Sequence, residues 1–181
     1  LNRRAEHRLL NAERMTVAAG LADCAGKLRA GWRDVLFNQF HDILGGTCVK
    51  PADADARNLH GRALQGAGEV LHRALQTLAR DLDTTCEGFP LVVFNPNPFD
   101  IEAGIEAELQ WAWEFPWYAG DLALTDPEGG TVPCQVIREL SALPRFRSRF
   151  VFQDRIPSLG YRVYQVAQAT PPESPGPAPS T

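Results

Sequence analysis

The sequence predicts an α+β protein, with an N-terminal antiparallel three-helix bundle followed by an antiparallel β-sandwich portion. Up to about residue 86, apolar residues recur at steps of three and four, which is the spacing of one buried helix face. From residue 87 on, short apolar or alternating stretches are separated by Gly, Pro and Asn, which is typical of strands joined by turns. We therefore expect a helical domain over 1–86, a β portion over 87–168, and a Pro/Ser-rich linker or tail over 169–181.

The composition is that of an ordinary globular protein. Of the 181 residues, 44% are hydrophobic and 22% are charged, and the net charge is −4. Scattered arginines in an acidic chain argue against a nucleic-acid partner, and no apolar run approaches the roughly 20 residues that cross a bilayer. The chain starts without Met or a signal peptide, so we expect a cytoplasmic protein of which this is one part. The four cysteines lie far apart and favour buried free thiols, although a disulfide pair stays open.

Three helices are predicted in the first half. The first covers about Asn2 to Leu21, with Gly20 as its stop signal. The second covers 22–44, and the third covers 51–82 with Pro51 in its first turn. Thr47 could cap the third helix, and three glycines in its middle predict a weak or kinked stretch. Short connections between the helices favour an antiparallel arrangement.

Short strands are predicted in the second half. The clearest one starts at Ile101, where apolar residues alternate with Glu, Gly and Gln, as in a strand with one buried face. Further candidates are 91–94, 122–124, 132–136, 146–156 and 161–166. An open sheet edge can pair with a second copy, so a homodimer is a possible partner state.

The stretch from Trp32 to Thr47 is the most informative part of the sequence. The spacing predicts one buried stripe, made of Trp32, Leu36, Phe40 and Ile43. A second apolar face follows about 100° round the helix, made of Phe37, His41 and Leu44. We therefore expect this helix to meet its own domain on one face and another surface on the second, with His41 and Asp42 at the edge of that second face.

The residues alone give at most one wall of an active site, formed by Gln39, His41 and Asp42. His7, His60 and His72 are interpreted as solvated positions, and no second metal ligand lies at a recognisable spacing from any histidine. Neighbouring residues diverge by about 100° on a helix, so we expect Asp42 not to share a face with His41. No nucleophile elbow or phosphate loop is present in the sequence.

The segment Asn38–Thr47, NQFHDILGGT, closely resembles the N-Q-F-H-D-I-L-P-G-T/S segment of glycoside hydrolase family 38 α-mannosidases. The one clear departure is Gly45 in place of Pro. Three further stretches resemble the family in order and spacing: NRRAE with LNAE at 2–13, LVVFNP at 91–96, and IPSLGYRVY at 156–164. The resemblance thus covers most of residues 1–166.

The resemblance implies a specific function. Members are zinc-dependent, retaining exo-α-mannosidases, which hydrolyse terminal α-mannosyl residues of mannosides or mannose-containing glycans. We expect this chain to come from a bacterial-type cytosolic member. Their nucleophile, acid/base and other zinc ligands lie in an N-terminal catalytic barrel, so no catalytic residue is expected in this chain, and the chain alone should be inactive. The resemblance assigns His41 as a zinc ligand and Asp42 as a substrate-binding residue. This role requires a His41 ring that is open to a neighbouring domain, the barrel.

Two other functions stay open. The chain could be a non-catalytic glycan- or protein-binding module, with Trp111, Trp113, Trp117 and Tyr118 as a sugar-stacking platform. Alternatively, His41-Asp42 could be the centre of an all-helical metal phosphohydrolase of the H…HD…D type, with His7 as the upstream histidine. That hypothesis requires His7 and His41 to lie around one metal ion.

Overall fold

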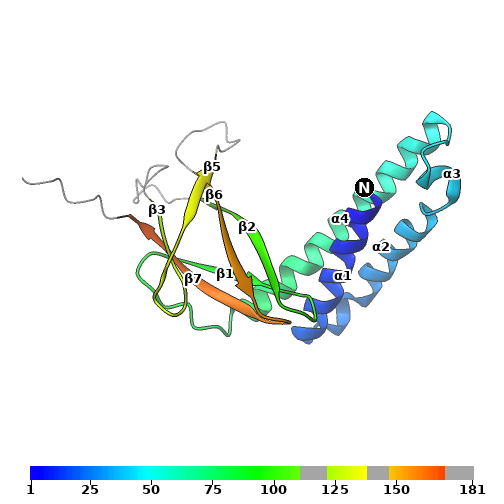
Figure 1. Ribbon diagram of the computed structural model, residues 1–181. Helices are drawn as coiled ribbons and strands as arrows, with labels where there is room; N and C mark the ends of the chain where they lie inside the picture. Colours follow the sequence, from blue (N-terminus) through cyan, green and yellow to red (C-terminus); the bar gives the residue numbers. More distant parts are fainter. Residues whose placement is uncertain (111–121, 138–146, 170–181) are drawn as a thin grey trace, which may run out of the picture. The chain divides into compact units, whose positions relative to one another are not determined.

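The α+β class is confirmed by the computed structural model, which describes residues 1–110, 122–137 and 147–169 (Figure 1). The chain divides into two compact units, Leu1–Asp83 and Thr84 onward. The first unit is helical, and the described strands all lie in the second. Each unit is described on its own below.

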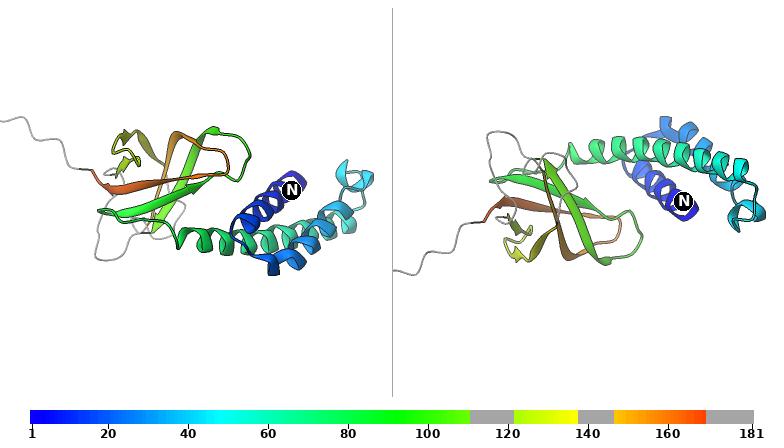
Figure 2. Two further views of the ribbon diagram at one scale, coloured as in Figure 1. Left: turned by 90° about the horizontal axis from the view of Figure 1, so that it is seen from below. Right: turned by 90° about the horizontal axis from the view of Figure 1, so that it is seen from above.

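The helical unit is built around its longest helix, which runs beside two others (Figures 1 and 2). Its elements are α1 (Asn2–Ala18), the 3-10 turn η1 (Ala22–Cys24), α2 (Ala25–Phe37), α3 (His41–Leu44) and α4 (Lys50–Ala79). Small and aliphatic side chains on the facing stripes form its core, among them Ala5, Leu9, Val35, Ala63, Ala67 and Ala74. Because so many of these are alanines, the helix backbones approach closely.

The helix ends follow local sequence signals in part. Gly20 has a positive φ of +67° and ends α1, where the Leu21 N–H donates to Thr16 O, and Pro51 lies in the first turn of α4. Two expectations were wrong. The glycines of α4 do not interrupt it, since it is one continuous helix, and Thr47 does not cap it, because its hydroxyl donates to Asp42 O at 3.3 Å instead.

The single helix predicted over 22–44 was also wrong. It is split into η1, α2 and α3, and the break between α2 and α3 falls at residues 38–40. Phe40 has φ −55° and ψ 137°, which is an extended conformation that ends one helix and redirects the chain into the next. This break determines where the candidate site lies.

The second unit contains two antiparallel sheets. The strands are β1 (Phe89–Phe94), β2 (Ile101–Gln110), β3 (Leu122–Thr125), β4 (Thr131–Val132), β5 (Cys134–Ile137), β6 (Arg147–Ile156) and β7 (Tyr161–Gln168). One sheet has the order β1-β7-β3-β4 and the other β2-β6-β5. The alternation predicted from Ile101 on is present: Ala107 is buried while Glu106 and Glu108 are exposed. Residues from both sheets share one apolar core: Ala107, Leu124, Val132, Phe150, Phe152, Ile156, Tyr164 and Val166.

One polar contact connects the two sheets through this core. The hydroxyl of Tyr164, a fully buried residue of β7, donates to Asp154 Oδ2 on β6 at 2.6 Å. Burial is the larger cause, and this hydrogen bond to a carboxylate the smaller one, of a pKa of Tyr164 that lies well above its usual value. Tyr164 therefore stays a neutral donor across the ordinary pH range.

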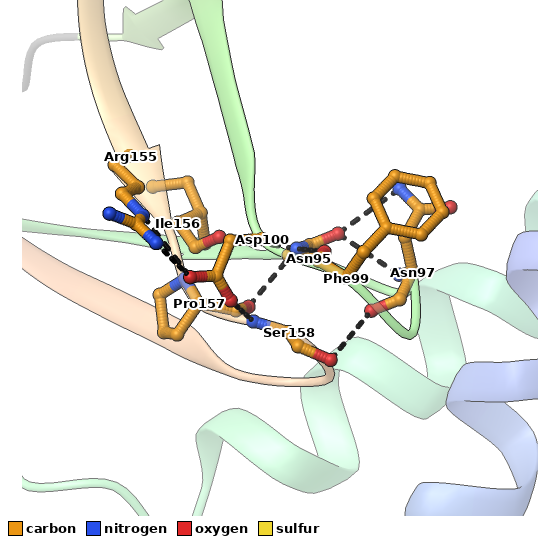
Figure 3. Close-up of polar contacts among 8 residues, drawn as sticks. All are labelled: Asn95, Asn97, Phe99, Asp100, Arg155, Ile156, Pro157 and Ser158. Atoms are coloured by element: carbon orange, nitrogen blue, oxygen red, sulfur yellow. Dashed lines mark hydrogen bonds and ion pairs between the residues drawn. The ribbon is translucent and has the colours of Figure 1, made fainter.

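A second polar centre joins the β1–β2 and β6–β7 connections (Figure 3). Asn95 is fully buried, and its Nδ2 lies 2.8 Å from Phe99 O, 3.2 Å from Ile156 O and 3.0 Å from Pro157 O. Its Oδ1 accepts from the backbone N–H of Asn97 at 2.9 Å. One amide side chain thus holds together two connections that are about 60 residues apart, since Asn95 and Ile156 are separated by 61 positions.

Asp100, beside this centre, gives a testable pH dependence. The Ser158 N–H, at 2.8 Å, and the Arg155 guanidinium, at 2.7 Å, hold the pKa of the Asp100 carboxyl below its ordinary value of 3.8. A carboxyl with a lowered folded-state pKa contributes stability above its unfolded pKa, and this contribution is lost as the pH falls through the folded pKa. We expect Asp100→Asn to lower the urea midpoint at pH 7, and the difference from the unmodified chain to shrink below about pH 4.

The matched control for Asp100 is Glu102→Gln, at an exposed position of β2 two residues away. It should change the midpoint little at either pH, because surface carboxyls without a fixed partner contribute little. An Asp100→Asn effect that is equal at pH 7 and pH 3 would contradict the assignment.

Candidate functional site

The candidate site lies on the one-turn helix α3, at the end of the helical unit where α2 connects to α4 (Figure 1). The Phe40 carbonyl accepts from the Ile43 and Leu44 N–H groups and starts the turn. Gly46, at φ +74°, ends it: the Thr47 N–H donates to Asp42 O and the Gly46 N–H to Ile43 O. This is the Schellman arrangement, which requires a left-handed residue at this position. Of the Gly45-Gly46 pair, Gly46 is therefore the residue at which the conformation favours glycine.

His41 and Asp42 both face solvent. The His41 side chain is 79% exposed and that of Asp42 is 55% exposed. His41 Nε2 lies 3.4 Å from Asp42 Oδ1, so the expectation that the two cannot share a face was wrong. The helix here has one turn only, and the imidazole is long enough to reach the neighbouring carboxylate. The Phe40 ring flanks the imidazole, with ring centroids 4.3 Å apart.

Large apolar side chains close to this pair in the sequence are also exposed. We call them the apolar surface: Leu36 (59% exposed), Phe37 (67%), Phe40 (54%), Leu44 (58%) and Val49 (72%). The predicted buried stripe is thus wrong for Leu36 and Phe40, because the helical unit buries Leu28, Gly31 and Val35 of α2 instead. Within the described unit, nothing covers the side of α2 and α3 that carries His41. Clustered exposed apolar residues are typical of an interaction surface.

Behind the apolar surface, the chain break is fixed by a polar layer that sequence reasoning missed. Its members come from three helices or their ends: Asn2 and Glu6 of α1, Asn38 and Gln39 after α2, and Ala56 and His60 of α4. Asn38 is fully buried and its Nδ2 donates to Ala56 O at 3.1 Å. Gln39 Nε2 donates to Glu6 Oε1 at 2.6 Å.

The interpretation of His60 as a solvated residue was wrong. Its side chain is buried, Nδ1 lies 3.0 Å from Ala56 O, and Nε2 lies 3.5 Å from Asn2 Oδ1. The signal was available in the sequence, because His60 stands four residues after Ala56 and three before Ala63, on the apolar stripe of α4. His7 and His72 are exposed, as expected.

The described residues do not complete a metal site. Within 1–110, 122–137 and 147–169, no group of three or more His, Cys, Asp or Glu residues could hold an ion. His41 and Asp42 offer one nitrogen and one carboxylate, which fits part of a zinc donor set but falls short of four ligands. The phosphohydrolase hypothesis needs a complete cluster around His7 and His41, and this part of the chain does not form one.

The four cysteines are free thiols. They do not add to the donors near His41, and burial raises the pKa of the Cys134 thiol in the β unit. The proposed sugar-stacking residues Trp111, Trp113, Trp117 and Tyr118 lie outside the described residues, as does most of the Pro/Ser-rich tail. No described helix is long and apolar enough to cross a membrane.

Two surface clefts of the helical unit lie away from His41. One, of about 780 Å³, is lined by residues of the end of α1 and the start of α2, among them Val17, Leu21, Ala25 and Leu28. The other, of about 660 Å³, is lined by Arg3, Arg4, His7, Arg8, Asn11 and Leu64. Neither includes a residue of α3, and the exposed side chains of His41 and Asp42 make the candidate site an open surface.

Comparisons with known proteins agree with the resemblance of the Asn38–Thr47 segment. Residues 1–78 match the family model of the alpha-mannosidase middle domain. No curated protein sequence matches the chain. Two solved structures share its fold, each at 17% identity: an alpha-mannosidase from Enterococcus faecalis V583, with a TM-score of 0.65, and a glycosyl hydrolase family 38 protein from Enterococcus faecalis, with a TM-score of 0.60.

These structural matches cover 92% and 96% of this chain but 23% and 24% of the solved chains, so this chain spans about a quarter of their length. At this identity the likeness shows the fold, and the family model adds a sequence match over the helical part. Residues 1–78 are therefore similar to the alpha-mannosidase middle domain, and the chain as a whole shares its fold with the corresponding part of these two proteins.

Proposed function

We propose that this chain is part of a zinc-dependent, retaining exo-α-mannosidase that removes terminal α-mannosyl residues. The observation that carries the proposal is the exposed His41-Asp42 pair on α3, within a segment that matches the family motif and inside the matched middle domain. A glycosidase of this type needs two carboxylates at the anomeric carbon, and the proposal places both in a barrel that this chain does not include. The chain then contributes to the site without carrying the catalytic pair.

In this proposal His41 contributes one nitrogen ligand to the zinc ion. A bound zinc ion supplies a positive charge with an open position for substrate oxygens. The imidazole suits this task because its side chain is 79% exposed, and the Phe40 ring lies beside it with ring centroids 4.3 Å apart. Asp42, 55% exposed beside it, is placed to accept hydrogen bonds from mannose hydroxyls.

The apolar surface around His41 is proposed to pack against the catalytic barrel. Leaving five large apolar side chains more than half exposed is unfavourable by roughly 25 cal/mol per Å² of apolar area. Covering them would offset this cost and would exclude water around a metal ligand, which strengthens its electrostatic interactions. The same contact would bring His41 to a site built mainly from barrel residues.

A non-catalytic module that binds a protein or a glycan is the alternative, because an exposed apolar surface suits such a partner equally well. A cytoplasmic location remains part of the proposal, and the four free thiols are in keeping with a reducing compartment. A homodimer through a sheet edge remains a prediction, which sedimentation of the chain in solution would test.

The chain alone is expected not to hydrolyse an aryl α-mannoside above the background rate, with or without added zinc. The described residues hold no complete zinc donor set, and the proposal assigns no catalytic carboxylate to them. The measurement is release of the aryl group by the 181-residue chain, compared with the same chain extended to the length of its solved relatives. Turnover by the short chain, or no turnover by the extended one, would contradict the proposal.

A further inference from the structure

The break between α2 and α3 is not caused by a Gly or Pro in the local sequence. Between Trp32 and Leu44 there is no Gly or Pro, and apolar residues continue at helical spacing through the break. A continuous helix over this stretch is therefore a competing state of the same segment. In that state Phe40 would have a ψ near −42°, instead of the observed 137°. The residues of α3, including His41, would then continue along the axis of α2.

Contacts with the two neighbouring helices select the broken state. Asn38 and Gln39 are the first two residues after α2, and each side chain is held by a different helix. Asn38 Nδ2 donates to Ala56 O of α4 at 3.1 Å, and Gln39 Nε2 donates to Glu6 Oε1 of α1 at 2.6 Å. These two tethers directly precede Phe40, where the backbone turns.

His60 completes the α4 side of this arrangement. Its Nδ1 donates to the same Ala56 carbonyl at 3.0 Å, and its ring lies 3.4 Å from Asn38 Nδ2. The imidazole therefore lies beside the Asn38 amide, and both side chains bond to the same carbonyl of α4.

Stabilisation of the fold does not explain this polar layer of Asn38, Gln39 and His60 well. Asn38 Oδ1 is buried and has no hydrogen-bond partner among the described residues. A buried polar atom left unpaired is costly, and apolar side chains of similar shape in place of such a pair are often as stable or more stable. A polar layer that is imperfectly satisfied is more useful for specifying one arrangement than for strengthening the fold.

We propose that Asn38, Gln39 and His60 are positioning residues, which hold the α2–α3 segment in its broken state and so set the direction of His41. The geometric part of this inference stands on the described contacts alone. Its meaning for zinc rests on the proposed function, and the two parts are tested separately below.

The test uses the whole 181-residue chain with Asn38→Leu and His60→Leu combined, observed by NMR. We expect the Phe40 carbon shifts to move from extended toward helical values. The amides of His41 and Asp42 are the first of α3 and have no carbonyl of α3 to bond, so they should exchange freely in the unmodified chain. In a continuous helix they would donate to Phe37 O and Asn38 O, and their exchange should slow by about tenfold or more.

The matched control is His72→Leu, which places the same change on an exposed position of α4 and should leave Phe40, His41 and Asp42 unaffected. His60→Gln, which retains a donor, should keep the break. A folded double variant whose Phe40 stays extended, with freely exchanging His41 and Asp42 amides, would overturn the inference. If the double variant does not fold, Gln39→Ala decides by the same readout, because this half-buried residue provides the α1 tether alone.

The zinc part is measured in the extended enzyme. Loss of positioning should weaken zinc binding by about 10–100-fold, as for residues that orient a metal ligand. A change in backbone at Phe40 with unchanged zinc affinity would leave the positioning inference in place and count against the proposed role of His41. Weaker zinc binding with an unchanged Phe40 backbone would show that zinc binding does not depend on the break, and it would overturn the positioning role.

Discussion

Replacing His41 by Ala in the extended enzyme is expected to abolish mannoside hydrolysis and to remove most of the bound zinc. Removing a direct ligand should reduce zinc affinity by more than the roughly 10–100-fold loss seen for residues that only hydrogen-bond to a ligand. Stability should change by no more than about 0.5 kcal/mol, because the side chain is 79% exposed and has no buried partner. Zinc content per mole of enzyme and kcat/KM for an aryl α-mannoside are the measurements.

The matched control for His41 is His72→Ala, an exposed histidine on α4 of the same unit. It should retain full zinc occupancy and activity. If His41→Ala retains its zinc and loses activity only modestly, the metal role is excluded, and the binding-module alternative gains support. If the chain alone then binds an apolar protein surface through α3, that alternative becomes the better account.

The largest loss of stability is expected from Asn95→Leu in the β unit. The substitution removes the donor that serves the Phe99, Ile156 and Pro157 carbonyls and the acceptor of the Asn97 N–H. Buried groups left unpaired cost about 1–3 kcal/mol each, and we expect a loss of roughly 3–5 kcal/mol in the free energy of unfolding. Urea unfolding followed by near-UV circular dichroism would measure it.

Asn97→Ala is the matched control for Asn95. It removes one side-chain hydrogen bond to Asn95 Oδ1, at 3.1 Å, but leaves the backbone N–H bond in place. A cost of about 1 kcal/mol is expected. Equal losses in the two variants would show that the turn conformation matters, rather than the buried amide of Asn95.

The strand pattern was predictable because its information is local. The side chains of β2 alternate between faces with a period of two, and the sequence from Ile101 alternates in the same way. One buried face and one solvated face follow directly. The partner of each strand was not predictable, since the pairing of β2 with β6 depends on residues more than 35 positions away.

The helix break was missed for the opposite reason. Its causes are the Ala56 carbonyl of α4 and the Glu6 carboxylate of α1, which no local window around Asn38 contains. Helical periodicity persists through the break although Leu36, Phe37 and Phe40 are exposed within the helical unit. Hydrophobicity indicates that a residue is usually covered by something, but it does not identify the covering surface.

The sequence therefore named His41 and Asp42 as candidates but did not predict their geometry. The motif around His41 selected the residue, whereas its exposure and its contact with Asp42 depend on a one-turn helix that propensity does not predict. His60 shows the complementary error: a histidine on an apolar stripe was interpreted by its residue type rather than by its position.

The pairing of β1 with β7 has a consequence for how the protein is made. β1 is the first strand of its unit to leave the ribosome, and its described partner, β7, is the last. Because synthesis adds about 5–20 residues per second, β1 stays for several seconds without this partner, with apolar side chains and an unpaired backbone. Pro90 within β1 lacks an N–H group and so weakens pairing of this strand with a stray chain. Nascent chains that stall before Tyr161 should be the ones that aggregate.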